Sequence, residues 1–395
     1  MIDRIHIENY KALKDVTIEL KSMHVLIGPN DSGKTSILSA LATLCRSADM
    51  HLEQAFLGYW EGRELVWRGS VDGLISLTAD MVLEGKPISY SLSSRFASSG
   101  RSVVIQSERY TFEVEVDCRS SDHDRTLVQR LAVGNQTGSP EQIEACKAIH
   151  RCLSGVQYYR WNPRMLALPV APDSTRRFRM NFDGFGLALF LDDILGFDRK
   201  RFGELEESFC AIFPEIESIK LSRQSAFRSR PDDREQVTKL DQAEGKGIYF
   251  GLRGGGQHLI PAAQASDGVL LILAYLAVLH SPEPPALILV EEPEKGVHPK
   301  RLREVLAILR KLVETQSHTQ VVLTTHSPYA IDLFEPEQVT LCTKNADGSI
   351  AVKQLSESEA VKEQQGIFTL GEIWTAEGDE HLANGARIAE RPATP

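Results

Sequence analysis

The chain has 395 residues, of which 42% are hydrophobic and 25% are charged. These proportions are ordinary for folded globular proteins, so they exclude a fibrous or disordered chain. The formal net charge of −10 argues against nucleic-acid binding over the whole surface, because phosphate neutralisation needs clustered Lys and Arg.

The sequence predicts a chain that neither crosses a membrane nor is cross-linked. Its longest apolar run, Val269–Leu279, is shorter than the roughly 20 residues that span a bilayer, and the N-terminus has no signal-peptide pattern. We therefore expect a cytoplasmic protein without a membrane partner. The cysteines form no CxxC pair, so we expect reduced and mostly buried thiols. They are Cys45, Cys118, Cys146, Cys152, Cys210 and Cys342.

The N-terminal half begins with β-structure. Residues 2–27 alternate apolar and polar in two runs and end in an apolar strand, and helical spacing then predicts a helix that starts near Gly33 or Lys34. Short β-prone stretches between Gly and Ser turns predict an antiparallel sheet from about residue 62 to 135, and residues 140–220 are mainly helical by their spacing. The polar stretch Ser222–Gly247 is predicted to be flexible or exposed.

The C-terminal half predicts a parallel core. The apolar run Gly268–Leu279 indicates a helix that Ser266 or Asp267 caps. Ala286–Val290 and Gln320–Thr325 are continuously apolar, as in central strands covered on both faces, and an amphipathic helix lies between them. The order strand, helix, strand implies a right-handed parallel crossover.

Residues 28–35 match the phosphate-binding pattern G-x-x-x-x-G-K-[ST] between a predicted strand and a predicted helix. Its glycines let the backbone curl so that successive N–H groups face the phosphates. We predict that Lys34 contacts the β- and γ-phosphates of ATP and that the Thr35 hydroxyl binds Mg²⁺. The predicted ATP-binding residues are Gly28, Pro29, Asn30, Asp31, Ser32, Gly33, Lys34, Thr35 and Ser36.

Three further polar residues follow the two predicted central strands. Hydrolysis at a P-loop needs a carboxylate at the end of a buried strand for Mg²⁺ and a group that orients water. We predict that Glu291 holds the metal and that Glu292 is the general base, the alternative being two acids that end a strand in solvent. His326 follows the second strand at the edge where open parallel sheets bind ligands, which favours a γ-phosphate sensor over a structural histidine.

Together these motifs resemble a known family. GPNDSGKTS at 28–36, ASDG at 265–268, LILVEEPEKGVHP at 287–299 and TTHSP at 324–328 look like the ABC-type ATPase heads of the RecF, SMC and OLD group, closest to its compact bacterial AAA-family ATPases. The opening IHIENYK and the stretch FDGFGLALFLDDI at 182–194 are also similar to the group. The resemblance implies an α/β P-loop NTPase fold with a mixed, largely parallel core sheet, an antiparallel β region and a helical insert.

The resemblance also assigns roles to residues. It implies that Ser266, Asp267 and Gly268 form a signature that contacts ATP held by a second subunit, so that ATP joins two copies in a nucleotide-sandwich dimer. It makes Lys295–His298 the D-loop region that crosses this interface and His326 the switch histidine. A helix cap would account for Ser266 and Asp267 without any contact to a second subunit.

The sequence departs from the family pattern at the metal acid and at the signature, and it does not identify the residue of the glutamine loop. The metal acid is Glu291 where many ABC-type heads use Asp, and the signature reads A-S-D-G where transporters have L-S-G-G. Gln157 and Asn162 are candidates for the glutamine loop. Basic clusters at 176–179, 199–201 and 223–234 suggest either a DNA-facing surface or solvated faces.

We expect three segments: an N-terminal ATPase lobe at 1–165, a helical insert with an exposed Arg-rich segment at 166–247, and a C-terminal ATPase lobe at 248–395. Mg²⁺-dependent ATP binding and hydrolysis then switch a homodimer or higher oligomer between closed and open states, in a DNA-directed process such as genome defence or repair. Only residues 327–395 follow His326, so we expect any nuclease or other effector to be a separate protein. The alternatives are a subunit that energises a membrane transporter and an ATP-dependent scaffold with negligible turnover.

Overall fold

In the computed structural model the chain forms two compact units, each built from segments that are distant in sequence. The first unit is Met1–Gln157, Ala286–Glu291 and His318–Pro395, and the second is Tyr158–Pro285 and Glu292–Ser317. The structure describes residues 1–57, 62–97, 100, 102–112, 114–121, 124–133, 138–172, 177–229, 237–256, 258–316 and 318–384. No helix within these ranges is long and apolar enough to cross a membrane. The expected segment boundaries at 165 and 247 stay a prediction.

A largely parallel sheet forms the core of the first unit. Its strands in this unit lie in the order β15-β14-β3-β13-β12, where β3 pairs in parallel with β13 and β14, β13 pairs in parallel with β12, and β15 is antiparallel to β14. Every residue of β3, β12 and β13 is buried, which is why these strands read as continuous apolar runs. The strands are β3 Met23–Ile27, β12 Leu287–Glu291, β13 Gln320–Thr324, β14 Val339–Lys344 and β15 Ile350–Gln354.

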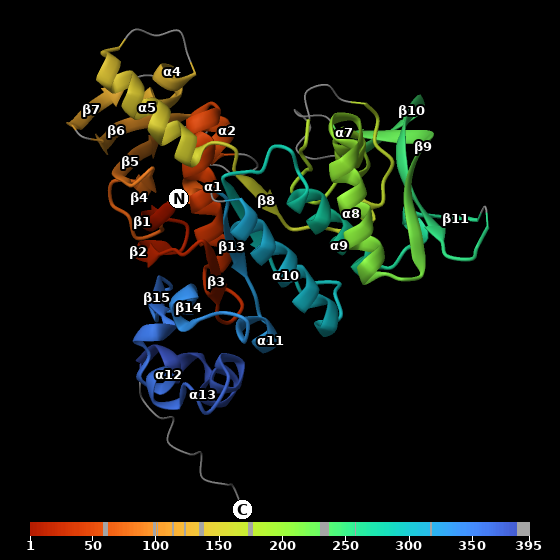
Figure 1. The fold of residues 1–395 in the computed structure, drawn as a ribbon. Coiled ribbons are helices and arrows are strands. Elements are labelled where there is room, and N and C mark those ends of the chain that lie inside the picture. The colour runs from red at the N-terminus through yellow and green to blue at the C-terminus, as the bar shows by residue number, and fades with distance from the viewer. Residues whose placement is uncertain are drawn as a thin grey trace, which may run out of the picture. The chain divides into compact units, whose positions relative to one another are not determined.

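The second sheet of this unit is antiparallel throughout, as the sequence predicted, with the order β2-β1-β4-β5-β6-β7. Burial alternates along β6, as expected when one face of a sheet is covered. Figure 1 shows α5 against this sheet, and α5 contacts β4. The strands are β1 Ile2–Tyr10, β2 Leu13–Glu19, β4 Leu74–Leu83, β5 Lys86–Phe96, β6 Val103–Phe112 and β7 Val114–Ser121.

The helix α1 joins the two sheets of the first unit. It begins at Lys34, where the sequence predicted a helix start, and it packs against β1, β12 and β13 through its buried apolar residues. The helices of this unit are α1 Lys34–Asp49, α2 Leu52–Phe56, α3 Gly62–Leu65, α4 Leu127–Ala132, α5 Pro140–Leu153, α11 Pro328–Ile331, α12 Glu359–Gln364 and α13 Leu370–Asn384, which bends at Gly378.

The apolar helix α9 is the core of the second unit. Every residue from Val269 to Leu279 is buried, and α6, α7, α8 and α10 contact this helix. Figure 1 shows α7 and α8 beside β9 and β10, which they contact. The elements are β8 Gln157–Tyr159, which begins at the unit boundary, α6 Pro163–Leu166, α7 Leu187–Phe197, α8 Arg199–Ile212, β9 Ile216–Ser229, β10 Val237–Leu252, β11 Leu259–Pro261, α9 Asp267–Leu279 and α10 Pro299–Thr315.

The segment predicted to be flexible or exposed lies largely in a β-ladder. The strands β9 and β10 pair antiparallel with Ser222 opposite Gly247, while Ser222 and Arg223 remain exposed as predicted. Polar residues on an open face carry no alternating apolar signal, so the pairing of main-chain groups was invisible in the sequence. Residues 230–236 lie outside the described part.

The cysteines agree with the expectation of reduced thiols. Five of them are free, and the side chain of Cys118 is outside the described part. Cys45, Cys146, Cys152 and Cys342 are buried, and Cys210 is half-buried.

Candidate nucleotide-binding site

The predicted phosphate-binding loop connects β3 to α1 and needs glycine at two positions. Gly28 has a φ of 132°, and a Cβ atom there would lie 2.2 Å from the carbonyl oxygen of Cys342. Gly33 has a φ of 81°, and its Cβ would lie 2.6 Å from the side chain of Ile350. Both are left-handed conformations that side chains disfavour, so the loop is curled and packed on its own unit before any ligand binds.

Lys34 occupies the inside of this curled loop. Its ammonium donates hydrogen bonds to the carbonyl oxygens of Gly28 at 2.9 Å and Pro29 at 2.7 Å, and to the Ser32 hydroxyl at 3.3 Å. The helix behind it, α1, has Gly33 as its N-cap residue, and it has neither a side-chain cap nor an acidic residue in its first turn. The N–H groups of this helix end, together with a buried cation, therefore form a site suited to phosphate.

The strands of the core sheet bring three of the predicted residues to one edge. In the parallel register Thr324 lies opposite Glu291 on one side and opposite Leu26 on the other. The carboxyl ends of β3, β13 and β12 are therefore neighbours, and they lead into the loop at Gly28, to His326 and to Glu291 respectively. Glu291 ends its strand in a buried position and not in solvent.

Magnesium fits these residues without a cage of protein ligands. No group of three or more His, Cys, Asp or Glu side chains suited to a metal occurs among the residues that the structure describes. Mg²⁺ in nucleotide sites is held by one or two side chains, nucleotide phosphates and water. The exposed Thr35 hydroxyl at the start of α1 and the Glu291 carboxylate at the end of β12 meet that requirement in donor type.

Two lysines near the loop escaped the sequence analysis. Lys344, at the end of β14, forms an ion pair with Asp31, a loop residue with a φ of 63°. Lys11 donates a hydrogen bond to the Ser39 hydroxyl of α1 at 3.2 Å; burial lowers the pKa of its ammonium, and the negative charge of Glu291 opposes that shift. Lys11 ends the stretch IHIENYK, whose resemblance to the family gave this lysine no role, and Lys344 is distant in sequence from the loop.

Glu292 follows Glu291 in the chain and begins the second segment of the second unit, Glu292–Ser317. Its φ is 47°, a left-handed conformation that is unfavourable for glutamate and that occurs more often at functional sites. Its side chain is mostly buried and forms an ion pair with Lys295.

The predicted signature lies at the start of α9 in the second unit. Ser266 occupies the N-cap position, yet its side chain makes no capping hydrogen bond. Ser266 and Asp267 are exposed, and a Cβ on Gly268 would meet no atom within 4 Å. The Ser266 hydroxyl therefore does not form the helix-capping hydrogen bond that was the alternative explanation for this residue.

The two glutamine-loop candidates differ in their surroundings. The Asn162 side chain accepts a hydrogen bond from the N–H of Arg164 at 3.0 Å and caps α6, which accounts for this residue structurally. The Oε1 atom of Gln157 is buried without a hydrogen-bond partner in the part of the chain that the structure describes.

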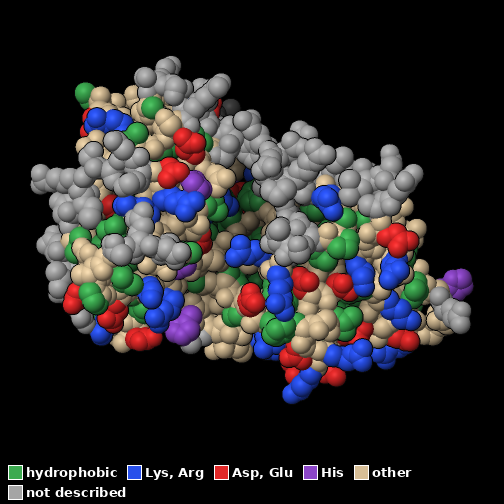
Figure 2. Space-filling view, turned by 90° about the horizontal axis from the view of Figure 1, so that it is seen from above, with side chains coloured by type: hydrophobic (Ala, Val, Ile, Leu, Met, Phe, Trp, Pro, Cys, Tyr) green, Lys and Arg blue, Asp and Glu red, His purple; other side chains and the backbone are tan. Residues whose placement is uncertain are grey.

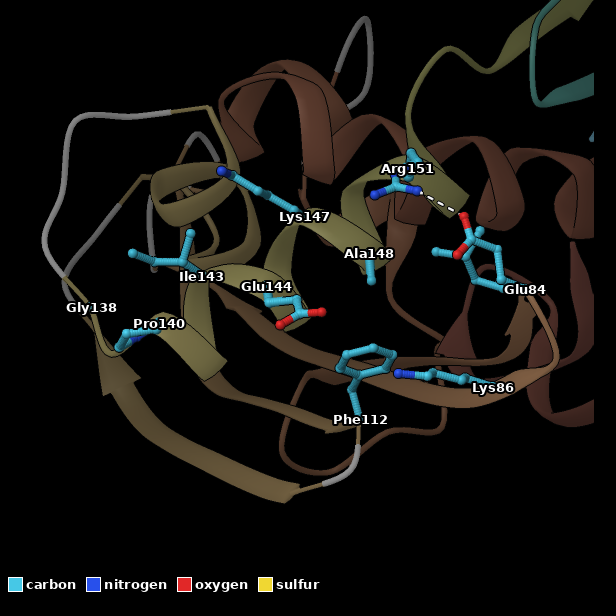
Figure 3. Close-up of a pocket in the computed structure, with 11 residues that line it drawn as sticks. Glu84, Lys86, Phe112, Gly138, Pro140, Ile143, Glu144, Lys147, Ala148 and Arg151 are labelled. Atoms are coloured by element: carbon cyan, nitrogen blue, oxygen red, sulfur yellow. Dashed lines mark hydrogen bonds and ion pairs between the residues drawn. The ribbon is translucent and has the colours of Figure 1, made fainter.

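A cavity of about 500 Å³ lies elsewhere in the first unit, between α5 and the turn from β4 to β5 (Figure 3). Phe112, Ile143 and Leu83 give it an apolar lining, and Glu84 pairs with Arg151 at 3.2 Å at its rim. None of the predicted site residues lines this cavity, so it is separate from the phosphate-binding loop.

Two family models match the chain. Residues 1–96 match the family described as AAA ATPase domain, which includes the phosphate-binding loop. Residues 176–332 match an AAA domain family whose description also carries the terms AbiEii toxin and Type IV TA system, and this match includes the signature, Glu291 and His326.

Two known proteins align with nearly the whole chain. The OLD nuclease of Thermus scotoductus (strain ATCC 700910 / SA-01) is 21% identical over 415 residues, covering 99% of this chain and 71% of the relative. The crystal structure of an SMC head bound to the C-winged helix domain of ScpA is 16% identical, with a TM-score of 0.52, covering 91% of this chain and 99% of that one. The family models and the relative support the resemblance of the motifs to ABC-type ATPase heads of the RecF, SMC and OLD group, and the structural neighbour shows the same fold.

Proposed function

We propose that this ABC-type head is an ATP-hydrolysing switch in which two copies of the chain close over nucleotide. The observation that carries the proposal is the shared sheet edge, where the phosphate-binding loop, His326 and Glu291 follow the neighbouring strands β3, β13 and β12. A site that only bound a phosphate would need the loop alone. A buried acid and a histidine beside it add the groups that hydrolysis requires.

Each residue at this edge has a distinct task in the proposal. Lys34 exchanges its bonds to the loop carbonyls for the β- and γ-phosphate oxygens of ATP. Thr35 and Glu291 would hold Mg²⁺, which would neutralise phosphate charge when bound. His326 contacts the γ-phosphate from the strand between them.

Glu292 activates the attacking water in this scheme. A carboxylate accepts the proton of water only when it is oriented toward it, and a strained backbone held by the surrounding turn is a means of fixing that orientation. The left-handed φ of Glu292 and its position directly after the metal acid support this role.

The second copy supplies the signature. Ser266 and Asp267 stand exposed at the start of a long buried helix, and the Ser266 hydroxyl is not used as a cap. A γ-phosphate presented by another copy would find this hydroxyl and the main-chain N–H groups of the helix start, and ATP would then join two chains. Closing and opening of the dimer follow ATP binding and hydrolysis as a population shift.

Size-exclusion chromatography with light scattering tests this proposal on the Glu292→Gln variant. With saturating MgATP the variant is expected to elute as a dimer with negligible turnover, because glutamine keeps the shape of the side chain but cannot accept a proton. Glu314→Gln, a change at an exposed acid of α10, is the matched control and should hydrolyse like the natural chain. A monomeric Glu292→Gln variant in saturating MgATP would contradict the dimer.

We also propose a DNA-directed setting with a separate effector protein, on the strength of the OLD nuclease relative. Two arginines of the predicted basic clusters already have contacts within the chain, which reduces the charge they can offer to DNA. Arg177 packs over the rings of Phe178 and Phe197, and Arg201 donates a hydrogen bond to the carbonyl oxygen of Ser281 at 2.8 Å. Arg223 lies 3.8 Å from Glu244, and Arg176, Arg230 and Arg234 are outside the described part.

Lys and Arg side chains are interspersed with Asp and Glu over the face drawn in Figure 2, which is no single basic field. DNA binding would therefore depend on a local surface, with a moderate dependence on salt. Retention on immobilised duplex DNA, measured at several salt concentrations with and without MgATP, decides the point. Absence of salt-dependent retention in both conditions would remove DNA from the proposal and leave the ATP-driven switch unaffected.

A further inference from the structure

We propose that Lys295 restrains the catalytic carboxylate of Glu292 and that the signature helix α9 controls this restraint, which would couple the two ATP sites of the dimer. This inference rests on the proposed function, because it concerns the regulation of the same hydrolysis. All of the contacts that carry it lie within the second unit.

The restraint is an ion pair inside one tight turn. The Lys295 ammonium pairs with the Glu292 carboxylate, and the Lys295 N–H donates to the Glu292 carbonyl oxygen at 2.9 Å. The next turn overlaps it, since the N–H of Val297 donates to the carbonyl oxygen of Glu294 at 3.1 Å. Lys295 is more than half exposed and Glu292 is mostly buried, so the lysine reaches back from the surface to the carboxylate.

The same turn rests on one face of the signature helix. A Cβ added to Gly296 would lie 3.5 Å from the side chain of Leu271 and 3.6 Å from that of Asp267. Burial raises the pKa of the Tyr275 hydroxyl, and the nearby Glu294 carboxylate raises it further. Asp267, Leu271 and Tyr275 are four residues apart and share a helix face, so the turn follows α9 over two helical turns.

This geometry joins two different ATP sites. Glu292 acts on the nucleotide bound by its own chain, whereas Ser266 to Gly268 face the nucleotide of the other copy. When α9 takes up the phosphate of the partner, the displacement of Asp267 is transmitted to Gly296, against which it packs. The turn then draws Lys295 away, and the Glu292 carboxylate is released to accept the proton of water.

The restraint has a chemical basis as well as a geometric one. A carboxylate that is bound to an ammonium has its oxygen lone pairs engaged and cannot orient a water molecule with them. Loss of the lysine therefore increases the fraction of sites with an available carboxylate, without changing the phosphate-binding loop. The expected signature is a higher kcat with an unchanged KM for ATP.

Steady-state hydrolysis by Lys295→Met tests the inference. We expect kcat to rise about fivefold or more, the lower range of coupling between sites in proteins, while KM stays constant. Lys295→Arg keeps a cation at this position and should remain closer to the natural chain. Lys311→Met removes the same charge from an exposed position on α10 and is the matched control.

The double variant Glu292→Gln with Lys295→Met shows whether the lysine acts through the glutamate. If it does, the double variant turns over as slowly as Glu292→Gln alone, and the two effects are strongly non-additive. A kcat for Lys295→Met equal to that of the control, or lower, would overturn the restraint while leaving the proposed function in place. Unchanged turnover in Glu292→Gln would instead contradict the proposed function itself.

Discussion

The starts of helices α1 and α9 are built from similar parts but present different chemistry. Both have an N-cap residue without a side-chain capping bond, so both leave main-chain N–H donors unsatisfied by their own side chains. In front of α1 a curled loop encloses the ammonium of Lys34, and two glycines fit against Cys342 and Ile350. In front of α9 Ser266 is exposed, the first turn contains Asp267, and residues 258–268 include no lysine.

The difference shows which helix can bind nucleotide alone. A triphosphate carries several negative charges, and only the start of α1 combines main-chain donors with a cation and a preformed curl. The start of α9 has donors but a carboxylate beside them, so it contributes only when another surface already holds the phosphates. Under the proposed function the two ends are complementary halves, and the first three predictions below separate one half from the other.

Replacement of Lys34 has the largest expected effect. Lys34→Ala removes two charge-assisted hydrogen bonds to phosphate, which at roughly 2 kcal/mol each weakens ATP binding by about a thousandfold. Isothermal titration calorimetry with MgATP measures this loss. Affinity equal to that of the natural chain would overturn the assignment of the loop.

Replacement of Ser266 is expected to affect turnover and not binding. Ser266→Ala removes a donor that meets only the partner's nucleotide, so kcat falls by about 100-fold, as for loss of one donor to a reacting oxyanion. Because the hydroxyl makes no capping bond, thermal stability stays close to that of the natural chain. Loss of ATP affinity in the monomer would show that α9 serves its own nucleotide.

Glycine-to-alanine substitutions at the two helix starts are expected to change the unfolding free energy by different amounts. Gly28→Ala forces a Cβ against the Cys342 carbonyl at a left-handed φ, which costs about 2 kcal/mol or more of the unfolding free energy. Gly268→Ala places a Cβ in open space within the first turn of α9 and should be neutral or stabilising by up to about 1 kcal/mol. Denaturant unfolding compares them, and equal losses would refute the contrast in packing.

The smallest expected effect concerns His24, which lies in β3 directly before the phosphate-binding loop. Burial lowers the pKa of His24 to about 3, and its Nε2 atom lies 2.9 Å from the Thr340 hydroxyl. In the unfolded chain His24 has its ordinary pKa near 6.5 and is protonated below that pH, whereas in the folded chain it stays neutral down to about pH 3. The unfolding free energy therefore falls as pH falls from about 6.5 towards 3. The slope from this one group is at most about 1.4 kcal/mol per pH unit.

Replacement of His24 by a residue that does not titrate isolates this contribution. His24→Asn should show a shallower loss of stability between pH 6.5 and 5 in denaturant titrations. The slope of the unfolding free energy against pH is measured within each protein, so a pH-independent loss of stability caused by the substitution does not affect the comparison. An identical slope in both proteins would assign the acid sensitivity to other groups.

The sequence predicted the fold where the signal is local. The loop at Gly28, the buried strands β12 and β13 and the start of α1 all follow from apolar runs and glycine spacing, and the structure confirms them. The ladder of β9 and β10 was missed because its polar strands pair through main-chain groups. The periodicity of apolar residues indicates which residues are buried, but it does not indicate which exposed strands pair with each other.

The candidate site divides in the same way. The sequence predicted that Glu291 and His326 follow buried strands, but the spatial order β3-β13-β12 that makes these strands neighbours came from the structure. The contacts of Lys344 with Asp31 and of Lys11 with Ser39 depend on side chains that tertiary packing brings together, and no pattern in the sequence encodes them. The ion pair of Lys295 with Glu292 is local, but its meaning emerged only from the packing of Gly296 on α9.

Complementation between two inactive variants tests the central claim most directly. Lys34→Ala lacks a working phosphate-binding loop and Ser266→Ala lacks a working signature, so each alone should be nearly inactive. A mixed dimer regains one intact site, from the loop of the second variant and the signature of the first. The account predicts that mixing the two inactive proteins restores part of the ATP hydrolysis, at the slower rate of a site whose Lys295 restraint is not released by a second ATP, while either protein mixed with itself stays inactive. If the mixture is as inactive as its components, the two helix starts do not form a shared site.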